Sequence, residues 1–149
     1  IIMMADGLLF LSLLSGRNPD YLIGQHLRSV PKLKNSGLEI IPTAYLLIDG
    51  GRESAVAKVT QTRPMSQEGV EEIVHTAMAG QFQGAQLIYL EAGSGALHPV
   101  GSKIISEVKK HTQIPLIVGG GIRSQAQQEA AYQAGADMVV MGTAFESTS

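Results

Sequence analysis

The chain alternates short apolar runs with segments in which apolar residues recur every three or four positions. The first run, residues 5–14 (ADGLLFLSLL), is nearly continuous, which is typical of a strand buried on both faces. Similar runs predict further strands at 38–48, 86–90, 114–118 and 137–141. Pro42 lies inside the second run, so this strand needs either a bulge or a position at which no N–H is used.

Start and stop signals predict helices between these strands. The expected helices begin at Asn18, Ser66, Ser102 and Ser124. They end near Val30, within residues 80–84, at His111 and at Gly135. In the first, Asn18 precedes Pro19, the favoured order of N-cap and first helical residue, and Pro31 is expected to stop the helix. In the last, Ser124 and Gln127 form a capping box.

Apolar strands alternating with amphipathic helices predict an α/β fold with a parallel sheet. Glycine-rich segments follow the late strands, as at the carboxyl end of a TIM (β/α)₈ barrel, whereas a Rossmann-like sheet carries its glycines after the first strand. Five strands are predicted where a barrel has eight. We therefore expect residues 1–149 to form a single, incomplete barrel domain covering about strands 4 to 8, without the first three strands and the last helix.

Composition narrows the functional classes. The chain has 149 residues, 44% of them hydrophobic, and a net charge of −2, so it lacks the basic excess of a nucleic-acid binder. The absence of cysteine excludes disulfides and thiolate metal sites and fits a cytoplasmic protein. No apolar run approaches the roughly 20 residues that a membrane span needs. The four histidines show no metal-ligand spacing.

A glycine triplet, Gly119-Gly120-Gly121, connects the strand at 114–118 to the helix that Ser124 caps. Backbone N–H groups at a helix N-terminus, with glycines that permit close approach, can bind a phosphate. By itself the triplet is equally compatible with a turn that binds nothing.

The string Tyr89-Leu-Glu-Ala-Gly-Ser-Gly95 ends another strand and is the most unusual in the chain. Tyr89 and Glu91 share one face because they are two residues apart in a strand. At a barrel mouth Glu91 can accept a proton from a substrate hydroxyl. The alternative is a surface glutamate beside a packed tyrosine. Gly142-Thr143 follow the strand predicted at 137–141. Three neighbouring strands thus end in small residues, and together they predict a phosphate-binding site.

Residues 49–64 are the least regular part of the chain, and long loops in compact domains are usually functional or mobile. The segment carries Arg52, Lys58 and Arg63. Two interpretations stay open: a solvated loop, or a segment that closes over an anionic ligand. Arg123 is likewise either a phosphate partner, chiefly through its backbone N–H, or a member of an ion pair.

The strings YLEAGSGA, IPLIVGGGIRS and ADMVVMGTAFE together resemble the geranylgeranylglyceryl phosphate synthase family, which includes bacterial heptaprenylglyceryl phosphate synthases. FLSLLSGRNPDYLIGQH and EIIPTAYLLID match other parts of its pattern. The resemblance implies a TIM barrel that joins the C3 hydroxyl of sn-glycerol 1-phosphate to a polyprenyl diphosphate with the help of Mg²⁺. This reaction makes the first ether bond of isoprenoid glycerolipids. By analogy we expect a homo-oligomer, a dimer or a hexamer.

The resemblance also implies site residues. Glu91 would bind the glycerol hydroxyls and take the proton, and Tyr89 would gate the prenyl chain. Residues expected to bind substrate are Tyr89, Leu90, Glu91, Ala92, Gly93, Ser94, Gly95, Gly120, Gly121, Gly142 and Thr143.

The metal site that the resemblance implies lies on strands that this sequence does not include. Neither Asp6 nor Asp49 is expected to replace its ligands, since Asp6 enters its strand at the wrong end and Asp49 starts a turn. Two alternatives to the prenyltransferase stay open: another phosphate-binding barrel isomerase or lyase, and a barrel fragment without catalytic activity.

Overall fold

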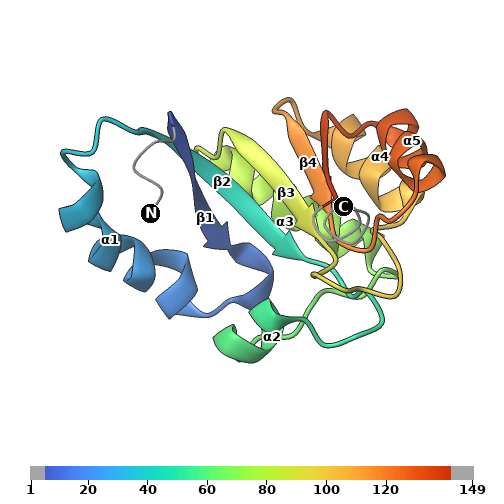
Figure 1. Ribbon diagram of the computed structural model, residues 1–149, viewed down its shortest axis with the longest axis horizontal. Helices are drawn as coiled ribbons and strands as arrows, with labels where there is room; N and C mark the ends of the chain where they lie inside the picture. The colour runs from blue at the N-terminus through green and yellow to red at the C-terminus, as the bar shows by residue number, and fades with distance from the viewer. Residues whose placement is uncertain (1–5, 142–149) are drawn as a thin grey trace, which may run out of the picture.

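The computed structural model describes residues 6–141 (Figure 1). Five parallel strands form one sheet in chain order: β1 (Gly7–Leu13), β2 (Glu39–Leu47), β3 (Leu87–Glu91), β4 (Leu116–Gly119) and β5 (Met138–Val140). Each strand pairs with the next one along the chain. This winding is that of a barrel, because a doubly wound sheet reverses its strand order near the middle.

The helices lie mainly on one face of the sheet (Figure 1). They are α1 (Gln25–Leu33), α2 (Ala55–Thr60), α3 (Val70–Phe82), α4 (Ser102–His111) and α5 (Gln125–Ala134), with a short 3₁₀ turn at Leu14–Gly16 and a π-helical turn at Asp20–Gly24. The main core lies between the strands and α3, α4 and α5; it includes Ala44, Leu46, Ile73, Ile88, Leu90, Ile104, Val108, Leu116 and Val118.

A second cluster covers the other face of the sheet near the carboxyl ends of β1 and β2. Leu13, Tyr45 and Leu47 are buried there against Ala57 of α2. These residues alternate with those of the main core, as the two-residue period of a strand requires. Both faces of β2 are therefore apolar at this end, which explains the continuous apolar run in the sequence.

Two predicted helix starts are confirmed and one is wrong. Helix α4 begins at Ser102, and the Ser124 hydroxyl accepts a hydrogen bond from the Gln127 N–H (3.1 Å) at the start of α5. Ser66 does not cap α3, because its hydroxyl accepts from the Glu68 N–H in a turn. Gly69 is the N-cap, and the helix begins at the following residue.

Pro31 does not stop α1, which continues to Leu33. The proline lies in the last turn of the helix, where it removes one N–H donor. The next turn is still closed, since the Lys34 N–H donates to the Val30 carbonyl (2.9 Å). Only Lys32 and Leu33 of the helix follow the proline, so its effect is confined to the last turn.

Pro42 occupies a regular position in β2. The register with β1 is unbroken over residues 39–45, so there is no bulge. The Pro42 carbonyl accepts from the Gln86 N–H (2.8 Å), which lies just before β3. The amide and carbonyl of one residue point to the same side of a strand, so the missing N–H also faces β3. Pairing there starts one residue later, with Thr43 and Leu87, and the N–H is not needed.

The predicted loop at 49–64 contains the helix α2. Ser54 caps it, accepting a hydrogen bond from the Ala57 N–H (3.0 Å). The helix is six residues long and includes the β-branched Val56, Val59 and Thr60, so neither length nor propensity marks it in the sequence. It forms because Ala57 and Thr60 are buried against the sheet.

Helix α3 ends at Phe82, within the predicted range 80–84, so Gly80 lies inside the helix, and we expect Gly80→Ala to destabilise the fold. A Cβ on Gly80 would lie 2.6 Å from the Ala44 Cβ and 2.8 Å from the Leu14 Cδ1. Ala44 belongs to the buried strand β2 and cannot retreat. Overpacking costs about 1–3 kcal/mol, more than the roughly 1 kcal/mol that alanine gains in a helix. The measurement is the free energy of unfolding in urea.

Gly24→Ala is the matched control, because Gly24 is also helical. A Cβ there meets only the end of the Asp20 side chain, which can rotate away. Gly24→Ala should therefore be neutral or stabilising. Equal effects of the two substitutions would show that Gly80 is not needed for close packing of α3 on β2.

Candidate active site

Tyr89 and Glu91 project from the carboxyl end of β3 on the face opposite the main core. Tyr89 lies between Tyr45 of β2 and Ile117 of β4. Glu91, two residues further along, lies between Leu47 of β2 and Gly119 of β4. The Tyr45 and Tyr89 rings meet edge to face, with centroids 5.3 Å apart. The shared face of Tyr89 and Glu91, predicted from their two-residue spacing, is confirmed.

The Glu91 carboxylate is partly buried and is held by the backbone of the turn that follows it. Its Oε2 accepts from the Gly93 N–H (3.0 Å), and the Tyr89 hydroxyl lies beside it. Burial raises the pKa of Glu91 above its usual range, and the neighbouring Gly93 N–H and Tyr89 hydroxyl offset only part of that shift. A carboxylate with a raised pKa is a better proton acceptor than an exposed glutamate.

The two tyrosines are fully protonated at ordinary pH. Burial raises the pKa of Tyr45 and of Tyr89 well above that of a free phenol, and the Glu91 charge adds to both shifts. Tyr89 is thus a fixed hydrogen-bond donor beside the carboxylate. The sequence singled out Tyr89 but not Tyr45, because only the register between β2 and β3 brings the two rings together.

Gly119 makes room for these side chains. A Cβ at this position would lie 3.0 Å from the Tyr89 hydroxyl oxygen and 3.4 Å from the Glu91 Oε1. The sequence predicted substrate contacts for Gly120 and Gly121 and did not include Gly119. Its role is seen only where β4 passes beside β3.

Gly120 and Gly121 lie against the segment that follows β3. Both have positive φ, 87° and 73°. A Cβ on Gly120 would overlap the Glu91 Oε2 and lie 2.6 Å from the Gly93 nitrogen, and one on Gly121 would lie 2.9 Å from the backbone of His98. Glycine is thus required at both positions by conformation and by close approach. Two of the three predicted strand ends are therefore in contact.

The residues predicted to bind substrate are not equivalent in the structure. Leu90 and Ala92 are fully buried in the main core, so their side chains do not face Glu91. The Gly93 N–H, predicted to be free for a phosphate, donates to Glu91 instead. Ser94 is exposed. Gly142 and Thr143 lie outside the described residues, and their phosphate contacts stay predictions.

Arg123 forms no ion pair with another described residue, and its predicted phosphate contact stays a prediction. Its backbone N–H donates to the Gln127 side chain (2.7 Å), and its guanidinium donates to the Ala96 carbonyl. It therefore ties the start of α5 to the segment after β3. The side chain of Gln127 completes the capping interaction one residue earlier than a capping box does.

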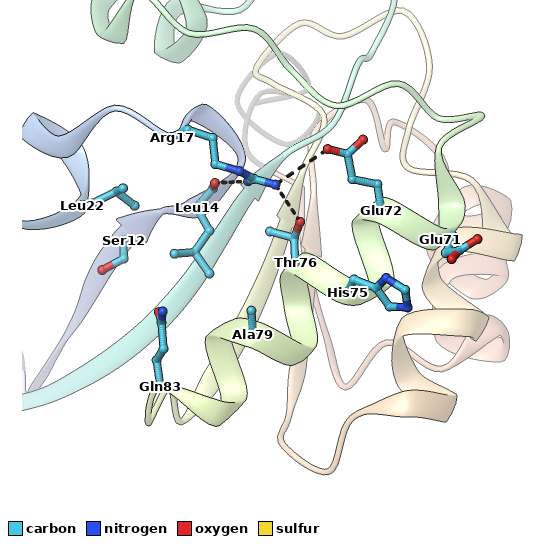
Figure 2. Close-up of a pocket in the computed structure, with 10 residues that line it drawn as sticks. All are labelled: Ser12, Leu14, Arg17, Leu22, Glu71, Glu72, His75, Thr76, Ala79 and Gln83. Carbon is cyan, nitrogen blue, oxygen red and sulfur yellow. Dashed lines mark hydrogen bonds and ion pairs between the residues drawn. The ribbon is translucent and has the colours of Figure 1, made fainter.

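A cavity of about 790 Å³ lies away from Glu91, between α3 and the segment that follows β1 (Figure 2). Ser12 and Leu14, which line it, alternate with residues of the Glu91 face and so belong to the opposite side of the sheet. The Arg17 guanidinium in this cavity already has partners within the chain, since it donates to the Leu14 carbonyl and the Thr76 hydroxyl and pairs with Glu72 (3.7 Å). The cavity is therefore separate from the candidate active site.

The described residues do not form a metal site. Within residues 6–141, no three or more histidine, aspartate and glutamate side chains lie close enough to hold a metal ion. Glu91 is the carboxylate at the candidate site, and its Oε2 already accepts from the Gly93 N–H. Asp49 caps a turn by accepting from the Gly51 N–H (2.9 Å), as predicted. In the same part of the chain, no helix is long and apolar enough to cross a membrane.

Strand winding and the glycine-lined rim define the class: the chain is part of a TIM barrel. The model of the PcrB family matches residues 1–149, and the chain belongs to this family. It is 64% identical over 143 residues to the geranylgeranylglyceryl phosphate synthase of Zunongwangia profunda and 53% identical over 145 residues to that of Flavobacterium johnsoniae. The family predicted from the motifs is confirmed.

Solved structures support the fold. The (S)-3-O-geranylgeranylglyceryl phosphate synthase of Thermoplasma acidophilum, in complex with substrate sn-glycerol-1-phosphate, superposes with a TM-score of 0.91 at 38% identity. That match covers 98% of this chain and 58% of the Thermoplasma chain. The two bacterial relatives are matched over 96% and 97% of this chain and 61% and 60% of their own lengths. The chain thus spans about three fifths of the relatives it matches.

Proposed function

We propose that the protein joins sn-glycerol 1-phosphate to a polyprenyl diphosphate, and that this chain supplies the glycerol phosphate side of the active site. The observation that carries the proposal is the partly buried Glu91, held between Gly93 and Tyr89 with a raised pKa. The names of the relatives and the substrate in the Thermoplasma acidophilum complex support it.

In the proposed reaction the C3 hydroxyl oxygen forms a bond to the allylic carbon as the carbon–oxygen bond to diphosphate breaks. The electron pair of the broken bond leaves with the diphosphate, and the hydroxyl proton passes to a carboxylate oxygen of Glu91. The Gly93 N–H holds that carboxylate in place, and the Tyr89 hydroxyl lies beside it. Correct placement of the hydroxyl is the larger contribution of the protein.

The phosphate of the substrate would lie over the ends of β3 and β4. Gly120 and Gly121 allow a ligand to approach the backbone there, since they have no side chains and turn with positive φ. Gly95 and Ser94 border the same place. Gly142 and Thr143 complete the set that the family resemblance implies.

Four further properties belong to this proposal and rest on the family resemblance and the composition. They are assistance by Mg²⁺, a role in isoprenoid phospholipid biosynthesis, assembly into homo-oligomers and a cytoplasmic location. The described residues supply no set of ligands for Mg²⁺. The proton transfer proposed above is assigned to Glu91, with the Tyr89 hydroxyl beside it.

The test is incubation of the purified full-length protein with sn-glycerol 1-phosphate and a radiolabelled polyprenyl diphosphate. We expect a labelled ether product together with one equivalent of diphosphate. Glycerol 3-phosphate, the mirror-image acceptor, is the control and should react poorly. Binding of glycerol phosphate without any ether product would contradict the proposal and favour another phosphate-binding barrel enzyme.

A further inference from the structure

The segment between β2 and α3 is fixed onto the segment that follows β3. The Gly50 carbonyl accepts hydrogen bonds from the N–H groups of Leu97 (2.8 Å) and His98 (3.0 Å). A Cβ on Gly50 would lie 2.5 Å from the Ala92 carbonyl oxygen, which shows how closely the two backbones approach. The position of the neighbouring residues is therefore set relative to the candidate active site.

The other end of the same segment is also anchored. Met65 forms a parallel bridge with Ile48, and its N–H donates to the Leu47 carbonyl (2.8 Å). The Gln67 side chain donates to the carbonyls of Asp49 (2.9 Å) and Pro99 (3.0 Å). Both ends of the segment are thus anchored by hydrogen bonds at the same edge of the sheet, which fixes the position of its backbone.

Arg52 extends from this anchored segment to the turn after β3. Its Nη1 lies 3.8 Å from the position that a Cβ on Gly95 would take. The side chain is exposed, and within residues 6–141 no carboxylate pairs with it. The carboxylate of the nearby Asp49 accepts a hydrogen bond from the Gly51 N–H. A guanidinium therefore stands beside the glycine turn without a counter-ion among the described residues.

Two other arginines lie near this turn. Arg63 lines a hollow of about 380 Å³ that Arg52 also lines, together with Thr62 and Ala57. Arg123 approaches the segment after β3 at Ala96, to whose carbonyl its guanidinium donates. Of these arginines, Arg52 is the one that reaches Gly95.

We propose that Arg52 binds the phosphate group of glycerol phosphate through its guanidinium, an assignment that rests on the proposed function and extends it. Its planar fork of N–H donors matches two phosphate oxygens, which a lysine cannot do. The site would then combine the glycines of two strand ends with one fixed positive charge. Arg52 is a binding residue in this assignment and takes no part in the proton transfer.

The test compares Arg52→Met with Arg63→Met in the full-length protein. Both remove an exposed cation from the same segment and keep a similar aliphatic length. We expect Arg52→Met to raise the Kd of sn-glycerol 1-phosphate, measured by isothermal titration calorimetry, about 10- to 100-fold, the usual weight of a hydrogen-bonded charge. Arg63→Met should stay within about twofold of the unmodified protein. Arg52→Lys should fall in between, because it restores the charge without the fork.

Steady-state kinetics identify which phosphate group Arg52 binds. A rise in KM for glycerol phosphate, with KM for the polyprenyl diphosphate unchanged, supports the assignment. A rise confined to the polyprenyl diphosphate would overturn it, and so would equal effects of Arg52→Met and Arg63→Met. Absence of ether product from the unmodified protein would instead reject the proposed function, and this assignment with it.

Discussion

Replacing Glu91 by glutamine is expected to lower kcat/KM for ether formation by about 100- to 10,000-fold, the usual loss when a positioned general base is removed. Glutamine keeps the size of the side chain, and its carbonyl oxygen can still accept from the Gly93 N–H. What it loses is the ability to take the proton of the glycerol hydroxyl. Glu68→Gln, at an exposed position, is the control and should leave the rate unchanged.

The same substitution is expected to stabilise the fold at neutral pH. Because burial raises the pKa of Glu91, the folded protein holds this proton to higher pH than the unfolded chain does. The stabilisation from this proton is fully present below the pKa that Glu91 has in the unfolded chain. It is lost as the pH rises through the pKa that Glu91 has in the folded protein. Thermal unfolding of Glu91→Gln should therefore match the unmodified protein at low pH and exceed it at neutral pH. A lower melting temperature at neutral pH would mean that the hydrogen bonds to the carboxylate outweigh its burial.

Gly120→Ala is expected to destabilise the fold by about 2–5 kcal/mol, combining backbone strain with overpacking. The φ of Gly120 is 87°, which an alanine adopts only with strain. Its Cβ would overlap the Glu91 Oε2 and lie 2.6 Å from the Gly93 nitrogen, so both the carboxylate and the backbone would have to move. Urea denaturation measures the loss of stability, and the ether assay should show a parallel loss of activity.

Gly37→Ala separates the two causes. Gly37 also has a positive φ, 76°, but a Cβ there would meet nothing within 4 Å. We expect it to cost about 1 kcal/mol, the value of strain alone. If Gly120→Ala costs no more than Gly37→Ala, the close approach of the β4 end to Glu91 does not constrain the site.

Much of the fold follows from local patterns. The apolar runs mark all five strands, although only the inner ones are buried on both faces. The edge strands β1 and β5 are partly exposed, with Leu11, Met138 and Val140 facing solvent, which corrects the burial predicted for the first run. Ser124 is a cap in the structure as it is in the pattern, since a capping hydroxyl needs only the N–H groups of the next turn. The shared face of Tyr89 and Glu91 follows from strand geometry alone.

Other features depend on contacts between distant segments. Helix α2 forms because Ala57 packs beneath the second cluster, and its own six residues do not indicate it. Gly80 is needed inside α3 because the helix approaches Ala44 of β2 closely at this position. Helix propensity is a property of each residue, whereas these two positions are decided by contacts with other strands of the sheet.

The sequence alone determined the parallel α/β class, the family and the pair Tyr89 and Glu91, because strand periodicity and short motifs are local properties of the chain. The tertiary structure decided which backbone groups the site can offer. It showed that the Gly93 N–H holds Glu91, that Gly119 leaves space for Tyr89, and that Arg52 reaches Gly95. Each of these depends on strands and loops that meet only when the sheet is formed.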